Sequence, residues 1–192
     1  MKALCIIGSP QEQGSTAAIV GRIAAGLADA GCLITTYRLD AMRIGFCRGC
    51  KACAATGQCV QRDDMDLLIG ELMAADVIVI GSPSYWGDVT AQLKTFIDRC
   101  TPYSDTRPGG TPVPPGKHGI AVAVRAGHSK GENQHIVDTL AHFFGHLGIT
   151  LETSVTFESI RSTADLVERQ EAMEQAYQLG YQLVERSTDA DP

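Results

Sequence analysis

A run of four closely spaced cysteines is the part of this sequence best suited to chemistry. Cys47, Cys50, Cys53 and Cys59 follow the pattern C-x2-C-x2-C-x5-C and account for four of the chain's seven cysteines. Two-residue gaps let the backbone curl about a common centre, so that four thiolates can converge, as in the cysteine loops of bacterial ferredoxins. The spacing therefore predicts ligands of a 4Fe-4S cluster.

Other interpretations of these cysteines stay open. Zinc also accepts four thiolates, but structural zinc sites usually combine two separated cysteine pairs, whereas here all four lie in one short segment. Disulfides are disfavoured because residues 1–5 show no apolar signal region, which favours a reducing, cytoplasmic location. Free or redox-active thiols remain an alternative, since neighbouring cations increase thiol reactivity.

Positive charge is concentrated around the cysteines. Residues 43–62, here called the cysteine segment, contain four cations and no acidic residue: Arg43, Arg48, Lys51 and Arg62. Since the whole chain has a net charge of -6, the remainder carries -10. Nearby cations stabilise an anionic thiolate cluster, although simple exposure to solvent also explains a basic stretch. The overall negative charge argues against nucleic acid as a partner.

The length and composition predict a single domain, residues 1–186. A chain of 192 residues with 44% hydrophobic residues can bury one large core. No apolar stretch approaches the roughly 20 residues that a membrane helix needs, so no membrane partner is expected. Residues 101–117 hold five of the eight prolines and are expected to form a long loop. The polar residues 187–192 are expected to be a flexible tail.

Apolar runs and helical periods alternate along the chain. Strands are predicted at residues 3–7, 33–39, 77–80, 120–124 and 151–157. The first, third and fourth are continuous apolar runs, typical of strands buried on both faces of a parallel sheet. Helices are predicted at about residues 19–30, 65–72, 89–100, 136–147 and 166–184. This alternation predicts a doubly wound α/β fold, in which ligands bind beyond the carboxyl ends of the strands.

The loop after the first strand has the features of a phosphate site. Its glycines let the backbone fold closely, hydroxyl donors come from Ser9, Ser15 and Thr16, and a helix N-terminus follows with unpaired N–H groups. It lacks the patterns of a Walker A loop and of a dinucleotide-binding loop. An ordinary helix cap is the alternative explanation.

Two further loops lie after strands that are expected to be neighbours in the sheet. The loop after the third strand, Pro83-Ser84-Tyr85-Trp86-Gly87-Asp88, carries two adjacent aromatic residues that can border a flat heterocycle. Core packing or an interface is the alternative for this pair. The loop after the fourth strand, Arg125-Ala126-Gly127, can add a cation and backbone N–H groups to the same ligand.

Together these segments resemble a known family. The sequence is similar to the NAD(P)H-dependent FMN reductase group of flavodoxin-like proteins and, within it, to the iron-sulfur flavoproteins. The matching parts are Gly8-Ser9-Pro10 with Gly14-Ser15-Thr16, the run Cys47 to Cys59 followed by Asp63-Asp64-Met65, Ser82-Pro83-Ser84-Tyr85-Trp86-Gly87, and Lys94-Thr95-Phe96-Ile97-Asp98-Arg99.

The resemblance implies a flavodoxin-like fold, with a five-stranded parallel sheet, helices on both faces and bound FMN. It implies that Ser9, Ser15 and Thr16 hold the FMN phosphate, and that Gln11, Gln13 and Gly14 of the same loop also bind the cofactor. The isoalloxazine ring would lie against Pro83 to Asp88 and Arg125 to Gly127. The four closely spaced cysteines would be the cluster ligands.

The expected function is electron transfer between a two-electron flavin and a one-electron cluster. Expected partners are NAD(P)H or a reduced ferredoxin-like carrier, a small acceptor such as a quinone or an oxygen species, and further copies of the chain in a homodimer or homotetramer. One alternative is a cluster-free NAD(P)H-dependent FMN or quinone reductase with redox-active thiols. Another is a flavin-binding redox sensor or carrier without turnover.

Several other reactive residue types are expected to serve structure. His135, His142 and His146 fall on one helical stripe, but no further ligands are suggested, so a half-exposed helix face is expected. The remaining cysteines, Cys5, Cys32 and Cys100, lie in apolar surroundings and are expected in the core. Asp63 and Asp64 precede a predicted helix and are expected to cap it.

Overall fold

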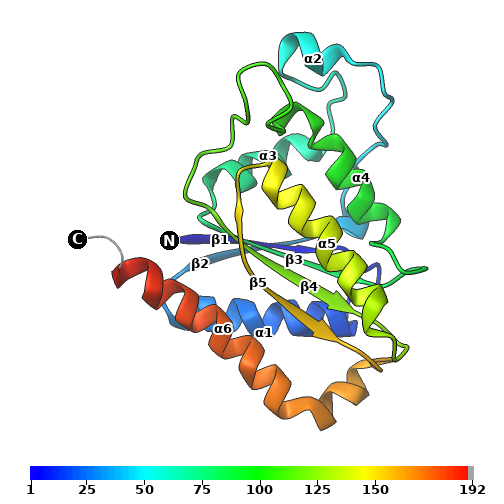
Figure 1. Cartoon of the computed structure of the whole chain (residues 1–192), viewed down its shortest axis with the longest axis vertical. Coiled ribbons are helices and arrows are strands. Elements are labelled where there is room, and N and C mark those ends of the chain that lie inside the picture. Colours follow the sequence, from blue (N-terminus) through cyan, green and yellow to red (C-terminus); the bar gives the residue numbers. More distant parts are fainter. Residues whose placement is uncertain (190–192) are drawn as a thin grey trace.

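The chain folds around one parallel sheet with helices on both faces (Figure 1). The computed structural model describes the backbone of residues 1–189, and the side chains of all of these except Lys130 and residues 187–189. The strands are β1 (Lys2–Ile7), β2 (Leu33–Arg38), β3 (Val77–Pro83), β4 (His118–Val124) and β5 (Thr150–Phe157). Their order is β2-β1-β3-β4-β5 with every pair parallel, which is the order of flavodoxin-like sheets. The five-stranded parallel sheet implied by the resemblance is therefore confirmed.

Two layers of helices cover the sheet. One face is covered by α1 (Ser15–Asp29) and α6 (Gln170–Asp189), and the other by α3 (Met65–Ala74), α4 (Ala91–Arg99) and α5 (Lys130–His146) (Figure 1). The remaining short elements are η1 (Leu39–Ala41), α2 (Ala52–Thr56), η2 (Thr101–Tyr103) and η3 (Thr163–Arg169). Among the described residues, no helix combines the length and apolar character needed to cross a membrane.

The burial of the strands follows their hydrophobic patterns. The continuous apolar runs form β1, β3 and β4, the three inner strands, and nearly all of their residues are buried. In contrast, β2 and β5 lie at the edges of the sheet, and most of their residues are exposed or only half-buried. The two faces of the sheet hold separate apolar clusters, one under each layer of helices. The expected burial of the first, third and fourth strands is therefore confirmed.

Two glycines allow α1 and α6 to cross at close range. A Cβ atom built on Gly26 would lie 2.0 Å from the backbone oxygen of Tyr177, and one built on Gly180 would lie 2.3 Å from that of Ile23. Both distances are shorter than any real contact, so any other residue at either position would push the helices apart. The position of α1 therefore depends on its contact with α6.

The last helix differs in detail from the sequence prediction. Its apolar period begins at Leu166, but residues 163–169 form the separate element η3, which opens on a capping box between Ser162 and Asp165. The helix α6 then continues to Asp189. Three residues of the expected tail, 187–189, are thus helical, and residues 190–192 lie outside the described part.

The proline-rich residues 101–117 begin with η2 and otherwise form a loop, and hydrogen bonds hold it against neighbouring elements. The Asp105 N–H donates to the His146 carbonyl at 2.8 Å, and the Lys117 ammonium donates to the Met73 carbonyl at 2.9 Å. The loop therefore follows the carboxyl end of α5.

Candidate functional site

The three loops singled out in the sequence meet at one edge of the sheet. They follow β1, β3 and β4, which are adjacent strands, so their carboxyl ends lie side by side. A cavity of about 200 Å³ lies between the loops. Its lining residues are Ser9, Gln11, Ser15, Thr16, Pro83, Ser84, Tyr85, Val124, Arg125, Ala126, Ile160 and Arg161.

The β1–α1 loop presents an uncapped helix N-terminus to this cavity. Gly14 occupies the N-cap position, and among the described residues no side chain caps the helix. The first helical hydrogen bond runs from the Ala18 N–H to the Gly14 carbonyl at 3.1 Å, so the N–H groups before it have no partner within the helix. These N–H groups and the hydroxyls of Ser15 and Thr16 are suited to a phosphate.

A buried threonine joins the first two loops. The Thr90 hydroxyl donates to the Gly8 carbonyl at 2.6 Å and accepts the Leu93 N–H at 3.3 Å, so it also caps α4. The Thr90 N–H donates to the hydroxyl of Ser82 at 3.2 Å. Because Thr90 is fully buried, these bonds are shielded from water and fix the spacing between the β1 and β3 loops.

Glu132 joins the second and third loops. One carboxylate oxygen of Glu132 accepts the Ser84 hydroxyl at 3.3 Å and pairs with the Arg125 guanidinium at 2.9 Å. The Arg125 side chain is only 11% exposed, and its buried Nε atom has no hydrogen-bond partner among the described residues. A buried donor without a partner is costly, so a shift of the Arg125 side chain that brought this N–H to a ligand would be favourable.

The aromatic loop after β3 closes in a tight turn. Tyr85 and Asp88 exchange two backbone hydrogen bonds, at 2.9 and 3.2 Å. The two residues between them, Trp86 and Gly87, both have positive φ, 57° and 78°. That conformation is unfavourable for tryptophan, and the Trp86 side chain is nevertheless fully exposed. Strain at an exposed aromatic residue points to a role in binding rather than in folding.

The structure gathers most of the predicted cofactor residues. Nine of them line the common cavity, while Gln13, Gly14, Trp86, Gly87, Asp88 and Gly127 lie in the same three loops outside its lining. Sequence reasoning missed Thr90, Glu132 and Arg161. Thr90 carried a signal, because it is a good N-cap residue immediately before a helical period. The other two carried none, since only the folded chain brings them to the loops.

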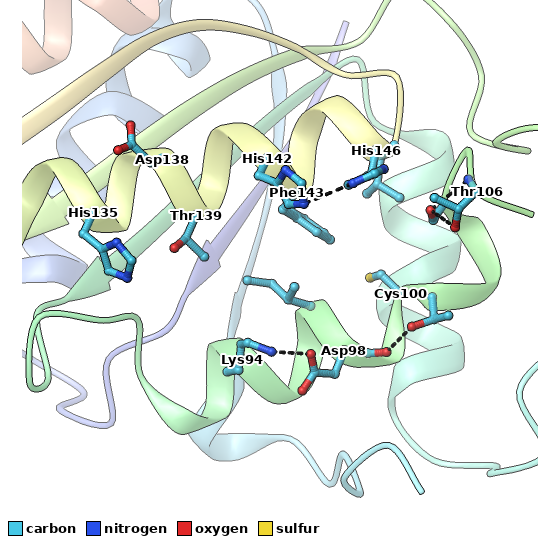
Figure 2. Close-up of a pocket in the computed structure, with 14 residues that line it drawn as sticks. Lys94, Asp98, Cys100, Thr106, His135, Asp138, Thr139, His142, Phe143 and His146 are labelled. Carbon is cyan, nitrogen blue, oxygen red and sulfur yellow. Dashed lines mark hydrogen bonds and ion pairs between the residues drawn. The ribbon is translucent and has the colours of Figure 1, made fainter. Parts of the chain in front are cut away.

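A larger cavity of about 560 Å³ lies elsewhere, in a groove between α4 and α5 (Figure 2). It is lined by His135, His142 and His146 among others, and by none of the predicted cofactor residues. Although this cavity is larger than the one between the three loops, it is not the candidate cofactor site, because the predicted cofactor residues do not line it.

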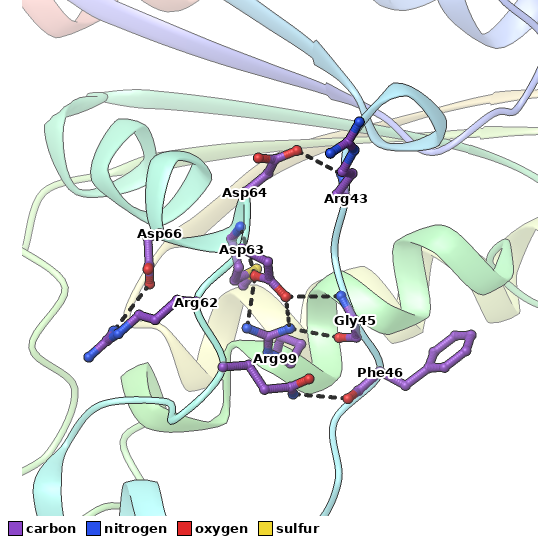
Figure 3. Close-up of polar contacts among 10 residues, drawn as sticks. Arg43, Gly45, Phe46, Arg62, Asp63, Asp64, Asp66 and Arg99 are labelled. Atoms are coloured by element: carbon purple, nitrogen blue, oxygen red, sulfur yellow. Dashed lines mark hydrogen bonds and ion pairs between the residues drawn. The ribbon is translucent and has the colours of Figure 1, made fainter.

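The cysteine segment is closed at its base by Gly45, Asp63 and Arg99, here called the base clamp (Figure 3). The Asp63 carboxylate accepts two bonds from the Arg99 guanidinium, at 2.7 and 3.0 Å, and one from the Gly45 N–H at 3.0 Å. Arg99 also donates to the Gly45 carbonyl at 2.7 Å. The two ends of the segment are thus joined to each other and to the last turn of α4.

Ionisation of the clamp is favoured by these contacts. Burial opposes the charge on Asp63, but hydrogen bonds from Arg99, Gly45 and Met65 outweigh it and lower the pKa of Asp63 below its ordinary value. The hydrogen bond to Asp63 raises the pKa of Arg99. Asp64 occupies the N-cap position of α3, yet its carboxylate accepts the Arg43 N–H at 2.7 Å rather than capping the helix. The two aspartates therefore mainly fix the cysteine segment.

The four closely spaced thiols are accessible and unpaired. Cys47 and Cys50 are exposed, Cys53 and Cys59 are half-buried, and all four are free. Among the described residues, no group of three or more His, Cys, Asp or Glu side chains is arranged to hold a metal ion. The donor set suits a cluster, but in this structure the four thiols do not converge on one point. Cys5, Cys32 and Cys100 are buried, as expected.

The fold is that of a flavodoxin-like protein, and its three loops are suited to a phosphate-bearing cofactor. A model of the family described as NADPH-dependent FMN reductase matches residues 1–159. The chain therefore belongs to the NADPH-dependent FMN reductase family, and the resemblance inferred from the sequence is confirmed.

Relatives in this family include iron-sulfur flavoproteins. One from Archaeoglobus fulgidus is 39% identical over 132 residues, which cover 69% of this chain and 58% of that protein. One from Methanocaldococcus jannaschii is 34% identical over 145 residues, covering 75% of this chain and 71% of that protein. An FMN-dependent NADH:quinone oxidoreductase from Shewanella baltica is 38% identical over 92 residues, which cover 44% of this chain and 46% of that protein. The chain thus spans less than two thirds of the first relative's length.

Solved structures share the fold. An azoreductase from Bacillus anthracis has a TM-score of 0.72 at 17% identity, covering 95% of this chain and 99% of that one. An NAD(P)H:quinone oxidoreductase from Methanothermobacter marburgensis has a TM-score of 0.72 at 15% identity, covering 95% of this chain and 96% of that one. At such low identities the likeness concerns the fold alone.

Proposed function

We propose that this chain is an FMN-dependent oxidoreductase that takes electrons from NAD(P)H or a reduced ferredoxin-like carrier. The observation that carries the proposal is the uncapped N-terminus of α1, which opens with Ser15 and Thr16 into a cavity formed by three adjacent loops. Membership of the FMN reductase family supports FMN as the ligand. When bound, FMN exchanges either a hydride or single electrons.

The residues of the cavity suit the phosphate end of FMN. Ser9, Ser15 and Thr16 offer hydroxyl donors, the α1 N-terminus offers backbone N–H groups, and Arg125 and Arg161 offer positive charge. At about 200 Å³ the cavity is below the roughly 300 to 1,000 Å³ usual for whole ligands, so it fits only part of the cofactor. The flat ring is then left to the open side, between the Pro83–Asp88 and Arg125–Gly127 loops.

The loops beside the ring have distinct tasks in this proposal. Ser84, Glu132 and Arg125 form one hydrogen-bonded chain that keeps the second and third loops at a fixed spacing. The Arg125 guanidinium, which lines the cavity, orients the ligand, and the Tyr85–Trp86 pair covers one apolar face of the flavin ring and excludes water from it. A quinone is a suitable acceptor, since it is flat and two solved or related proteins are named for quinone reduction.

We also propose that the chain binds a 4Fe-4S cluster at Cys47, Cys50, Cys53 and Cys59. The cysteine spacing and the names of the relatives support this proposal. Because the four thiols do not converge in the structure, cluster binding requires residues 47–59 to change conformation above the base clamp. The exposed thiols and the left-handed backbone at Gly49, Lys51 and Gly57 are compatible with such a change.

We propose, third, that copies of the chain associate as a dimer or tetramer. The exposed, strained Trp86 and the exposed side chain of Phe46 are the observations that favour it. Light scattering of the FMN-bound protein tests this, and a uniform monomer would remove the proposal.

The main proposal is tested by cofactor reconstitution followed by turnover. Protein stripped of ligand should bind FMN at one equivalent per chain, and FAD weakly or not at all. It should then reduce a quinone with NAD(P)H as the donor. Retention of FAD with indifference to FMN would reject the cofactor. FMN binding without turnover on any donor would favour a redox sensor or carrier.

The cluster is tested separately by anaerobic reconstitution and analysis of iron and sulfide. About four iron atoms per chain are expected for this cluster type. No iron together with normal NAD(P)H-dependent turnover would favour a cluster-free reductase with redox-active thiols.

A further inference from the structure

The groove between α4 and α5 contains two histidines in direct contact (Figure 2). His142 and His146 lie one turn apart on α5, and their Nε2 atoms are 3.1 Å apart. The rings meet edge to face, with centroids 4.4 Å apart and an interplanar angle of 88°. His135 lines the same groove two turns earlier on α5. The later two histidines are the pair whose ring nitrogens lie within hydrogen-bond distance of each other.

A carboxylate fixes the orientation of one of these rings. The Asp105 carboxylate lies 2.6 Å from Nδ1 of His146, and the Asp105 N–H also donates to the His146 carbonyl at 2.8 Å. With the Asp105 carboxylate accepting the proton on Nδ1, the Nε2 atom of His146 accepts the Nε2–H of His142 in the 3.1 Å hydrogen bond. A metal ion bound by both Nε2 atoms would take the place of that proton.

We infer that His142 and His146 form a site for a divalent transition-metal ion of the imidazole-preferring class. Two ligand nitrogens at 2.0 to 2.1 Å from one ion lie about 3.3 Å apart at a tetrahedral angle and about 2.9 Å apart at a right angle. The observed separation of 3.1 Å lies between these values. In such sites the ring nitrogen that does not bind the metal usually donates a hydrogen bond to a carboxylate. Here Nδ1 of His146 has Asp105 as that partner.

The surroundings of the pair suit a cation with open coordination positions. Among the described residues, no third His, Cys, Asp or Glu completes a metal-binding group, so the other positions are open to water in the groove. Cys100 also lines the groove, but burial raises its pKa well above the ordinary value, and it stays a neutral thiol. The charge of Asp98 is balanced by Lys94 at 2.5 Å, whereas Asp138 adds negative charge to the lining. The site is thus a two-histidine site.

The chemistry of imidazole sets the order of affinity. For nitrogen sites, divalent ions of the first transition row bind in the order Mn²⁺, Co²⁺, Ni²⁺, Cu²⁺, with Cu²⁺ tightest. Mg²⁺ and Ca²⁺ prefer oxygen ligands and should not compete. An ion at this site would also connect α5 to the proline-rich loop through Asp105. This inference is independent of FMN and of the cluster.

The test is a calorimetric titration of the FMN-bound protein with Ni²⁺. Besides any ion held by the four thiols of the cysteine segment, one ion per chain should bind, and H142Q and H146Q should each weaken the binding of that ion at least tenfold, because the chelate is lost. D105A should weaken Ni²⁺ binding about 10-fold to 100-fold, as loss of the hydrogen-bond partner of a ligating histidine usually does. H135Q is the matched control, on the same helix and groove, and should bind as the unmodified chain does.

The four thiols of the cysteine segment are the competing explanation, since they also bind Ni²⁺. A variant with all four changed to serine should retain the histidine-dependent binding. The inference is overturned if H142Q and H146Q bind like H135Q, if the four-serine variant binds no Ni²⁺, or if no saturable binding is seen. Retention of FMN by each variant shows that the fold is intact, because none of the changed residues lines the cofactor cavity.

Discussion

The base clamp predicts a large and local effect of one substitution, Asp63→Asn. The Arg99 side chain is 1% exposed and the Asp63 side chain 16%, so the pair is almost wholly removed from water. Replacing the carboxylate by an amide leaves a buried guanidinium without its counter-charge. Breaking a buried pair in this way costs about 3 to 5 kcal/mol. For a chain of this size, that corresponds to a fall in Tm of roughly 6 to 20 °C.

The matched control for this change is Asp66→Asn, three residues along the same segment of chain. Asp66 pairs with Arg62 at 3.7 Å, and their side chains are 50% and 66% exposed. Exposed pairs of this kind contribute about 0 to 1 kcal/mol. Urea denaturation of both variants gives the comparison. If D63N were no more destabilising than D66N, the clamp would not hold the segment as argued.

Two further measurements separate loss of the clamp from general loss of the fold. In D63N, the thiols of the cysteine segment should react faster with a disulfide reagent, because the base of the segment is released, while FMN affinity should change little. The difference in stability between the native chain and D63N should also depend on pH. The pKa of Asp63 in the folded chain lies below its usual value near 3.8. The extra free energy of unfolding of the native chain over D63N is therefore fully present at pH values above 3.8, and it declines as the pH falls through the folded pKa.

Three other predictions follow from the cofactor loops and the cysteine segment. Changing Ser15 and Thr16 together to Ala should raise the FMN dissociation constant at least tenfold, since hydrogen bonds to charged groups contribute about 1.5 to 3 kcal/mol each; a fluorescence titration measures this. Cys50→Ala should abolish iron uptake in anaerobic reconstitution while FMN remains bound. Trp86→Gly should stabilise the ligand-free chain by up to about 1 kcal/mol in urea denaturation, because left-handed backbone costs tryptophan about 1 to 2 kcal/mol, yet it should weaken FMN binding.

Most of the fold could be predicted because it depends on patterns along the chain. The apolar runs 3–7, 77–80 and 120–124 became the three inner strands, since only residues buried on both faces need to be apolar throughout. The main error of detail concerned the last helix, which was predicted to begin at Leu166. The capping box at Ser162 and Asp165 instead starts a separate short element over residues 163–169, and periodicity alone does not reveal it.

The candidate site could be predicted only as far as its loops. Gly14, Ser15 and Thr16 carry their signal locally, because loop and helix cap are neighbours in sequence. Arg161 lines the cavity and Glu132 contacts two of its lining residues, Ser84 and Arg125, from segments that become neighbours only when the sheet forms. The contact of Asp105 with His146 was hidden in the same way, since 41 residues separate the two. The sequence therefore showed a histidine stripe and could not show its carboxylate partner.

The crossing of α1 and α6 has a consequence for the order in which the chain matures. The helix α1 precedes four of the five strands, and α6 follows all of them. Until α6 has been synthesised, the surface of α1 around Gly26 stays uncovered, although all five strands are already available to form the sheet beneath it. The helix that presents its N-terminus to the cofactor cavity is therefore fixed in place late, and a nascent chain should gain its flavin affinity only after α6 has packed against α1.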